Sequence, residues 1–213
     1  IGGEGSLGIV TRVVLKLHPR QDYHRTFFAA LVELENVHEL YDRACALDHT
    51  GLTAFELVPE TGVAGTIESF GVVRPMATRS DWYLLGRFSG TSPVDDTATA
   101  FLSEAVEAGL LLDAVVADTG AQEENLWVLR DELPPETLFD VKGAKFDAAV
   151  PIDRVAEYQR AAEAVAAELC GDEAVVYAFG HLGDGNLHLY VNASLERGSR
   201  MDPARVDEVQ AAI

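Results

Sequence analysis

The chain has 213 residues, 48% of them hydrophobic, which is enough to bury a core in one or two domains. Its formal net charge of −19 argues against a nucleic-acid partner, because phosphate binding needs a basic face and lysine plus arginine total 16. No apolar run approaches the ~20 residues that cross a bilayer, so we expect neither a membrane span nor a secretory leader.

The two cysteines, Cys45 and Cys170, are far apart and have no CxxC or CxxH neighbour. This spacing indicates neither a disulfide framework nor a cysteine zinc site. We therefore expect reduced thiols and a cytoplasmic protein. An acidic chain can bind an anionic small molecule only where a few cations or a metal ion reverse the local field.

The chain opens with a glycine-rich loop over residues 1–8, and an alternating β-branched run from Ile9 to Leu17 follows. The run predicts a strand that His18-Pro19 ends, since proline cannot donate to a ladder. The loop could offer N–H groups to a phosphate, although an ordinary tight turn is the alternative because no Lys-Ser/Thr follows. No strand precedes the loop and no methionine starts the chain, so we expect a missing upstream segment.

Strand and helix periodicities then alternate. Runs with a period of two predict strands, and apolar residues three or four positions apart predict helices; Ser92-Pro93 caps one of these helices. In chain order we expect strand 26–34, helix 37–48, strand 53–58, helix 60–70, strand 81–89, helix 94–108, strand 111–117 and helix 122–132.

Pro134-Pro135 then predicts a loop. After it we expect strand 142–150, a helix opened by Pro151 and Asp153, strands 173–179 and 187–192, and a helix that starts at Asp202. That last helix reaches Ile213 without a stop signal, so we expect a truncated C-terminus.

The order strand-helix-strand occurs twice in succession, which is the element order of a ferredoxin-like fold. We therefore predict an α+β fold, an enlarged ferredoxin-like antiparallel sheet with helices packed on it. The sequence has no internal repeat, which argues against a solenoid.

The most informative stretch runs from Gly180 to His188, between two β-forming runs. Asp184-Gly185 is a preferred two-residue hairpin turn. That turn would pair His181 directly with His188, with their Cβ atoms roughly 4.5–5.5 Å apart on one face.

Alternation places the remaining residues of these two strands on two faces. We expect Tyr177, Phe179, Tyr190 and Asn192 on the histidine face, which is the candidate site, and Val176, Ala178, Leu189 and Val191 on the core face. Two facing imidazoles suit a divalent metal that would still need a third ligand such as a carboxylate. The alternative is a strand pair whose histidines bond waters or carbonyls.

With these motifs the chain resembles the flavin-linked dehydrogenases of D-2-hydroxyglutarate, D-lactate and glycolate, in the vanillyl-alcohol-oxidase superfamily. Residues 3–11 with Leu15-Lys-Leu-His-Pro19 are similar to the end of the flavin domain, and residues 180–188 are similar to the signature Gly-His-x-Gly-Asp-Gly-Asn-x-His. The resemblance implies that residues 1–19 are a remnant of the FAD-binding domain, with Gly5, Gly8 and Ile9 at the cofactor. Residues 20–213 would then be a C-terminal substrate or cap domain, truncated at its end.

The resemblance further implies that His181 and His188 bind a divalent metal such as zinc, iron or manganese. A third ligand and a base would lie in a Glu-His-Gly segment beyond Ile213. Arg130 and Lys145 occupy the positions that hold substrate carboxylate, and Tyr190 occupies a further substrate position. We expect Arg130 and Lys145 to share a cavity with the two histidines and to form its positive wall.

Two residues depart from hydroxyglutarate-type members of the family. Pro134 stands four residues after Arg130, where those members tend to have a hydroxyl residue, and Tyr190 replaces an asparagine. Both departures disfavour hydroxyglutarate as the substrate.

We therefore predict the metal- and substrate-binding domain of an FAD-dependent dehydrogenase that oxidises a small anionic D-2-hydroxy acid to a 2-oxo acid. The fragment itself is expected to be inactive and to hold no flavin; a homodimer is compatible with this interpretation, and the electron acceptor is open. One rival function is a non-catalytic metal- or ligand-binding domain. Another is a metal-dependent hydrolase that uses His181, His188 and Asp184.

Overall fold

A computed structural model describes residues 6–17, 19–47 and 51–213 of the chain. Its strands are β1 (Tyr23–Leu31), β2 (Gly51–Pro59), β3 (Trp82–Gly90), β4 (Leu111–Val116), β5 (Ala144–Ala149), β6 (Val175–His181) and β7 (Asn186–Asn192). The α-helices are α1 (Val37–Cys45), α2 (Glu60–Phe70), α3 (Asp95–Glu107), α4 (Gly120–Asp131), α5 (Pro135–Leu138), α6 (Val155–Cys170) and α7 (Pro203–Ala212). Short 3₁₀ turns are η1 (Leu34–Asn36), η2 (Ile152–Arg154) and η3 (Leu182–Asp184).

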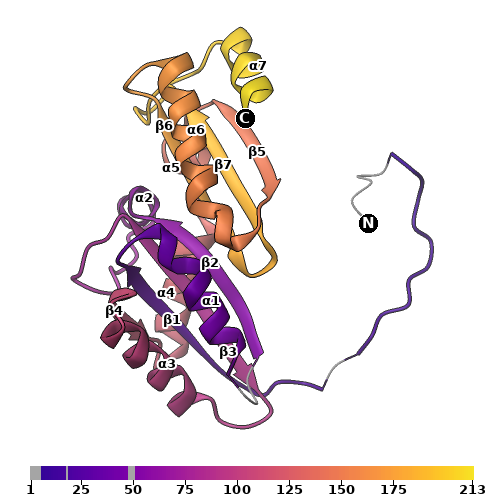
Figure 1. Cartoon of the computed structure of the whole chain (residues 1–213), viewed down its shortest axis with the longest axis vertical. Coiled ribbons are helices and arrows are strands. Elements are labelled where there is room, and N and C mark those ends of the chain that lie inside the picture. The colour runs from indigo at the N-terminus through magenta and orange to yellow at the C-terminus, as the bar shows by residue number, and fades with distance from the viewer. Residues whose placement is uncertain (1–5, 18, 48–50) are drawn as a thin grey trace.

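The strands form one seven-stranded sheet in the order β4-β1-β3-β2-β6-β7-β5, and each neighbouring pair is antiparallel. The first four strands have the ferredoxin-like order 4-1-3-2, and the later three extend the sheet beyond β2 (Figure 1). The predicted α+β fold class is therefore confirmed.

Helices cover both faces of the sheet. On one face, apolar residues of α1, α3 and α6 form the larger core with alternate residues of the strands. On the opposite face, Val63 of α2 and Leu126 and Leu129 of α4 pack on a smaller core that includes Tyr177 and Phe179. From the sequence we predicted an open site on this second face. Tyr177 and Phe179 are only 1% and 3% exposed, however, because α2 and α4 cover the face.

The two parts of the sheet join through a short contact. Strands β2 and β6 are paired only at Glu56 with His181 and at Leu57 with Gly180, whereas β2 and β3 are paired along most of their length. The residues of this junction lie near the middle of the sheet, so Glu56 and His181 stand where the two parts of the sheet meet.

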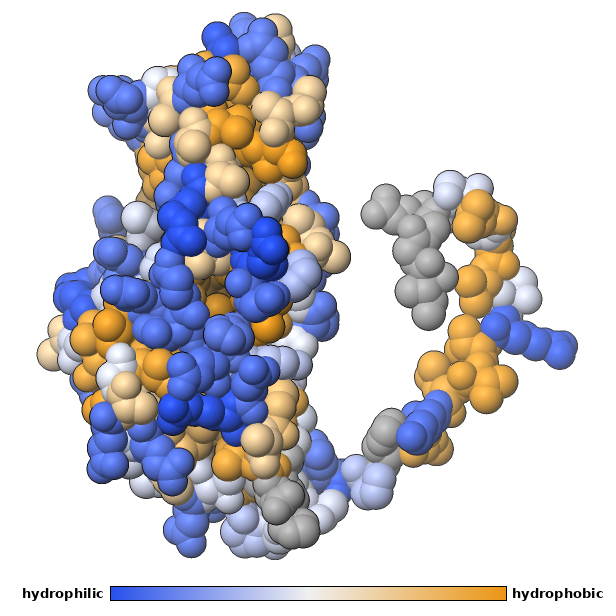
Figure 2. Space-filling view, viewed as in Figure 1, coloured by the Kyte–Doolittle hydropathy of each residue, from blue (hydrophilic) through white to orange (hydrophobic). Residues whose placement is uncertain are grey.

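The predicted strand at Ile9–Leu17 is wrong. The described residues 6–17 carry no helix or strand, and their apolar side chains, including Ile9, Val14 and Leu17, are exposed (Figure 2). A strand needs a neighbour that satisfies its backbone N–H and C=O groups, and this run has no ladder partner within the described chain. The predicted end of the first helix at Asp48 lies outside the described residues.

The Pro134-Pro135 loop contains a short helix that the sequence did not predict. Pro135 is its first residue, where the fixed φ of proline suits a helix and its missing N–H is not needed. The helix α5 places Glu136 beside Lys145 and packs Leu138 into the interior. It therefore closes one side of the sheet face that carries the histidines.

Candidate functional site

Three side chains from three separate elements form a polar core at the junction of β2 and β6. Glu56 of β2 accepts a hydrogen bond from Arg130 Nε at 2.7 Å through Oε2, and its Oε1 lies 2.9 Å from His181 Nδ1. Arg130 Nη2 lies 3.3 Å from both ring nitrogens of His181. Glu56 and Arg130 are 6% and 7% exposed, so this ion pair is buried.

Arg130 reaches this position because α4 ends beside the sheet. A capping box formed by Thr119 and Gln122 starts the helix, and Arg130 lies in its last turn, where a cation also interacts favourably with the helix dipole. The guanidinium carbon lies 5.5 Å from the ring centroid of Phe179. Both the carboxylate of Glu56 and the aromatic ring therefore fix the direction of the Arg130 side chain.

The hairpin that carries the two histidines differs from the prediction. His181 pairs with Asn186 and His188 pairs with Phe179, so the two histidines are diagonal neighbours and not direct partners. The register is displaced by two residues, which preserves the face of every side chain. The two imidazole centroids are 5.5 Å apart on one face of the sheet.

The register differs from the prediction because the turn between β6 and β7 is longer than the predicted two residues. Residues Leu182 to Asp184 form the 3₁₀ turn η3, and Gly185 alone takes the left-handed conformation, with φ of 77°. The predicted two-residue turn needs positive φ at both central residues, which Asp184 tolerates less well than glycine. Gly185 also accepts a hydrogen bond from the Val150 N–H through its carbonyl, and Leu182 is buried, so tertiary contacts favour the longer turn.

A cavity of about 320 Å³ opens beside this polar core. Its charged and imidazole lining comes from Glu56, Arg130, Asp131, His181 and His188. The remainder of its lining is aromatic or apolar: Trp127, Pro134, Phe179 and Tyr190. The structure thus brings Arg130, Tyr190, His181 and His188 of the predicted site together.

Lys145 does not line this cavity. It faces the same side of the sheet from β5, where it pairs with Tyr190, and its Nζ lies 5.3 Å from the Tyr190 ring centroid. Its ammonium group is ion-paired with Glu136 of α5. The lining holds two carboxylates and one guanidinium, so the positive wall expected from Arg130 and Lys145 is not present; each cation has its own carboxylate partner.

The two histidines meet part of what a metal ion requires. The Glu56 contact at Nδ1 orients His181 as an outer carboxylate does in many metal sites, but Arg130 Nη2 lies 3.3 Å from Nε2, so a metal at Nε2 requires the guanidinium to move away. Burial lowers the pKa of His188, as do Arg130 and His181 nearby, although Asp147 opposes them. His188 therefore favours the neutral form that binds metal. Among the described residues, no group of three or more His, Cys, Asp or Glu side chains could hold a metal.

The predicted flavin contacts are not assembled in the described part of the chain. Gly8 has open space where a side chain would lie, and Ile9 is 92% exposed. Gly5 lies outside the described residues. The role of these three residues at a flavin therefore stays a prediction.

Sequence reasoning missed Glu56, although a signal was present. Glu56 interrupts the apolar run Phe55 to Val58, whose other members are buried. A carboxylate in a buried strand is costly unless it is paired, so its presence there indicates a partner. The partner, Arg130, is 74 residues away in sequence and could not be identified from spacing.

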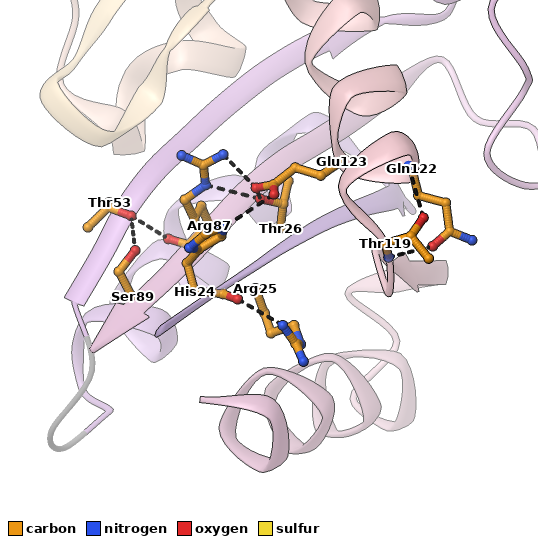
Figure 3. A network of polar contacts seen from close by, with 9 residues as sticks. All are labelled: His24, Arg25, Thr26, Thr53, Arg87, Ser89, Thr119, Gln122 and Glu123. Atoms are coloured by element: carbon orange, nitrogen blue, oxygen red, sulfur yellow. Dashed lines mark hydrogen bonds and ion pairs between the residues drawn. The ribbon is translucent and has the colours of Figure 1, made fainter. Parts of the chain in front are cut away.

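A second polar network lies on the same face, where α4 meets β1 and β3 (Figure 3). Glu123 of α4 accepts hydrogen bonds from Thr26 Oγ1 at 2.5 Å and Arg87 Nη2 at 2.6 Å, and its Oε2 lies 3.1 Å from His24 Nε2. Arg87 also stacks on Trp127, with its guanidinium carbon 4.8 Å from the ring centroid. This network therefore fixes both α4 and the Trp127 wall of the cavity.

Glu123 gives the chain an acid-sensitive contact. Burial alone would raise its pKa, but hydrogen bonds from Thr26 and His24 and the charge of Arg87 lower the pKa overall. A carboxyl with a depressed folded-state pKa stabilises the fold above its unfolded pKa, and that contribution disappears as pH falls through the folded value. We expect Glu123→Gln to destabilise the chain at neutral pH and the difference from wild type to shrink below about pH 4.

The measurement is urea unfolding of both proteins between neutral and acidic pH. Glu124→Gln, which removes the same charge from an exposed neighbouring position, is the matched control. A difference between wild type and Glu123→Gln that stays constant across this range would contradict the expected role of Glu123.

A family model described as "FAD linked oxidases, C-terminal domain" matches residues 24–213. The mitochondrial D-2-hydroxyglutarate dehydrogenase of Arabidopsis thaliana is 30% identical over 197 residues, which cover 91% of this chain and 34% of that protein. The D-lactate dehydrogenase of Anaerostipes hadrus is 31% identical over 199 residues, covering 89% of this chain and 40% of that protein.

The chain thus spans between a third and two fifths of the length of these curated relatives. Among solved structures, p-cresol methylhydroxylase with substrate bound aligns with a TM-score of 0.47 and 12% sequence identity, over 91% of this chain and 42% of that one. In the described part of the chain, no helix is long and apolar enough to cross a membrane.

Proposed function

The chain belongs to the family of FAD-linked oxidase C-terminal domains, and on this premise we propose that it is the substrate domain of an FAD-dependent D-2-hydroxy-acid dehydrogenase. Residues 1–19 belong to the flavin domain in this proposal, and residues 20–213 form the substrate domain. The observation that carries the proposal is the single cavity in which Arg130, held by Glu56, stands beside His181 and His188. The relatives support the reaction class, because they are D-2-hydroxyglutarate and D-lactate dehydrogenases.

Arg130 binds the substrate carboxylate in this mechanism. Its Nε is used by Glu56 and its Nη2 contacts His181, so the outer edge of the guanidinium is the part that remains for a ligand. Glu56 fixes that edge toward the cavity, which orients the hydroxyl-bearing carbon beside the imidazoles. Lys145 contributes a second cation only if the substrate displaces Glu136.

In this proposal His181 and His188 would hold a divalent metal, with a third ligand supplied from outside the described residues. The metal, when bound, supplies a Lewis acid that favours the ionised substrate hydroxyl. A metal would also supply positive charge that the site otherwise lacks, because the three carboxylates of Glu56, Asp131 and Asp147 exceed the single positive charge of Arg130 near the cavity. Oxidation would transfer a hydride from the α-carbon to FAD, the family's two-electron acceptor, and the hydroxyl proton would go to a base that we expect in a segment beyond Ile213.

The hydrolase alternative is disfavoured by the position of Asp184. Its Oδ1 accepts a hydrogen bond from the Asn186 N–H within the turn at 3.1 Å. Asp184 lines a neighbouring cavity together with His181, but it does not line the cavity that contains both histidines. The non-catalytic alternative has less support, because the relatives matched over about nine tenths of the chain are dehydrogenases.

The test is anaerobic reduction of the full-length protein that contains this chain. We expect the purified protein to carry FAD, and we expect its visible absorbance to bleach on addition of a D-2-hydroxy acid and to persist with the L-enantiomer. Oxygen-free mixing isolates this half-reaction from the unidentified electron acceptor. An FAD-loaded protein that no member of a panel of aliphatic, acidic and aromatic 2-hydroxy acids reduces would overturn the proposed function.

A further inference from the structure

The cavity beside the histidines is lined by a charged group of side chains and by an aromatic wall, which meet at Phe179. The charged group includes Arg130, Glu56 and the two imidazoles. Glu56 already contacts Arg130 Nε and His181 Nδ1, so this group is built around one guanidinium. One guanidinium matches one carboxylate, which a 2-hydroxy acid supplies next to its hydroxyl group.

The aromatic wall is held rigid by contacts among its own members. The rings of Phe179 and Tyr190 stack with centroids 5.8 Å apart and planes 10° from parallel. His188 lies against Phe179 with a centroid distance of 5.2 Å, and Arg87 stacks on Trp127 from outside the cavity. Flat, preorganised aromatic surfaces of this kind favour an apolar or aromatic ligand group.

A second carboxylate on the ligand would meet unfavourable charge. Asp131 lines the cavity, and Asp147 lies 3.3 Å from His188 Nδ1 through its Oδ1. Two further cations contact the aromatic lining from outside it, and each is paired with a carboxylate: Arg87 with Glu123 and Lys145 with Glu136. A dicarboxylate would therefore place its second charge beside aromatic rings and carboxylates, with no second cation in the lining.

We infer that the substrate of this site is a monocarboxylic 2-hydroxy acid with an aromatic or large apolar side chain. This inference rests on the proposed function and narrows it to one substrate class. The carboxylate binds Arg130, the hydroxyl faces His181 and His188, and the side chain packs against Trp127, Phe179 and Tyr190. Pro134 closes the wall without adding a polar group.

The test compares three 2-oxo acids, which bind the oxidised enzyme without reacting because they are the oxidised products. Isothermal titration calorimetry of the full-length FAD-loaded protein is run with phenylpyruvate, pyruvate and 2-oxoglutarate. We expect Kd for phenylpyruvate to be at least about tenfold lower than for either of the other two acids. Equal affinities, or tighter binding of 2-oxoglutarate, would overturn the inference and leave the dehydrogenase proposal standing.

A variant of the wall separates the aromatic contact from the shared carboxylate contact. Trp127→Ala should raise the Kd for phenylpyruvate by about tenfold and change the Kd for pyruvate by less than about threefold. Pyruvate binding therefore also reports that the variant is folded. Phe70→Ala removes an aromatic side chain that is 46% exposed at the end of α2, away from the lining, and serves as the matched control. A Trp127→Ala protein that keeps full phenylpyruvate affinity would contradict the assigned wall. Failure of all three acids to bind the wild-type protein would overturn the proposed function itself.

Discussion

Replacing Glu56 with alanine should lower the free energy of unfolding of this chain by about 3–5 kcal/mol, which is the usual effect of breaking a buried ion pair on one side. The reason is the guanidinium of Arg130, which is 7% exposed and would lose its carboxylate partner. His181 would lose the contact at Nδ1 as well. Urea unfolding followed by circular dichroism measures the change.

The matched control is Glu136→Ala, which removes the carboxylate partner of Lys145. The side chains of Lys145 and Glu136 are 55% and 34% exposed, so water replaces the lost contact and we expect a change of less than about 1 kcal/mol. Comparable losses in the two variants would show that the Glu56–Arg130 pair is not isolated from solvent. The Glu56→Gln variant should fall between them, because the amide oxygen still accepts one hydrogen bond from Arg130.

Local sequence patterns were sufficient to predict most of the fold. The β-forming run that contains Phe27 and Phe28 predicts a strand, and both of its faces are buried, Phe27 in the larger core and Phe28 in the smaller one. The helical stripe of Val37, Leu40 and Ala44 also states which side of its helix is buried. The structure confirms both elements and the sheet that they join. The run from Ile9 to Leu17 has the same local pattern, yet it has no ladder partner among the described residues, so local pattern alone does not make a strand.

The two histidines show where sequence reasoning reaches its limit. Alternation correctly placed His181 and His188 on one face, because a register displaced by two residues conserves the faces. The pairing itself depended on contacts from distant segments, among them the Val150 N–H at Gly185 and the Tyr41 hydroxyl at the Gly183 carbonyl. Such contacts leave no pattern within the hairpin sequence.

The ion-pair partners of the two cations also could not be predicted from the sequence. Arg130 and Lys145 were expected to act together as free cations, but each is paired with a carboxylate that the fold brings to it. The acidic composition explains this outcome, since 35 acidic residues compete for 16 basic ones. In such a chain, a cation is available to a ligand only where the geometry leaves part of it uncovered.

In the full-length enzyme, Arg130→Ala should reduce kcat/KM for 2-hydroxy acids by about hundredfold, corresponding to ~2.7 kcal/mol of lost transition-state binding. A charge-assisted hydrogen bond to a carboxylate has this magnitude, and Arg130 is the guanidinium that lines the cavity. The alanine variant also leaves Glu56 without its partner, so it is paired with Arg130→Lys. Lysine keeps the charge beside Glu56 but lacks the planar fork, and we expect kcat/KM to fall by at least about tenfold.

Steady-state rates with an artificial electron acceptor measure both variants, and flavin absorbance reports whether each remains loaded. Arg160→Lys, at an exposed position on α6 where the arginine pairs with Glu35, is the control for the general effect of this exchange. The fall in kcat/KM in the Arg130 variants should be equal for aliphatic and aromatic substrates, because all of these substrates present the same carboxylate. This distinguishes Arg130 from Trp127, whose removal should affect aromatic substrates alone. Unchanged kcat/KM in Arg130→Lys would mean that the guanidinium serves the Glu56 and His181 contacts and does not bind substrate.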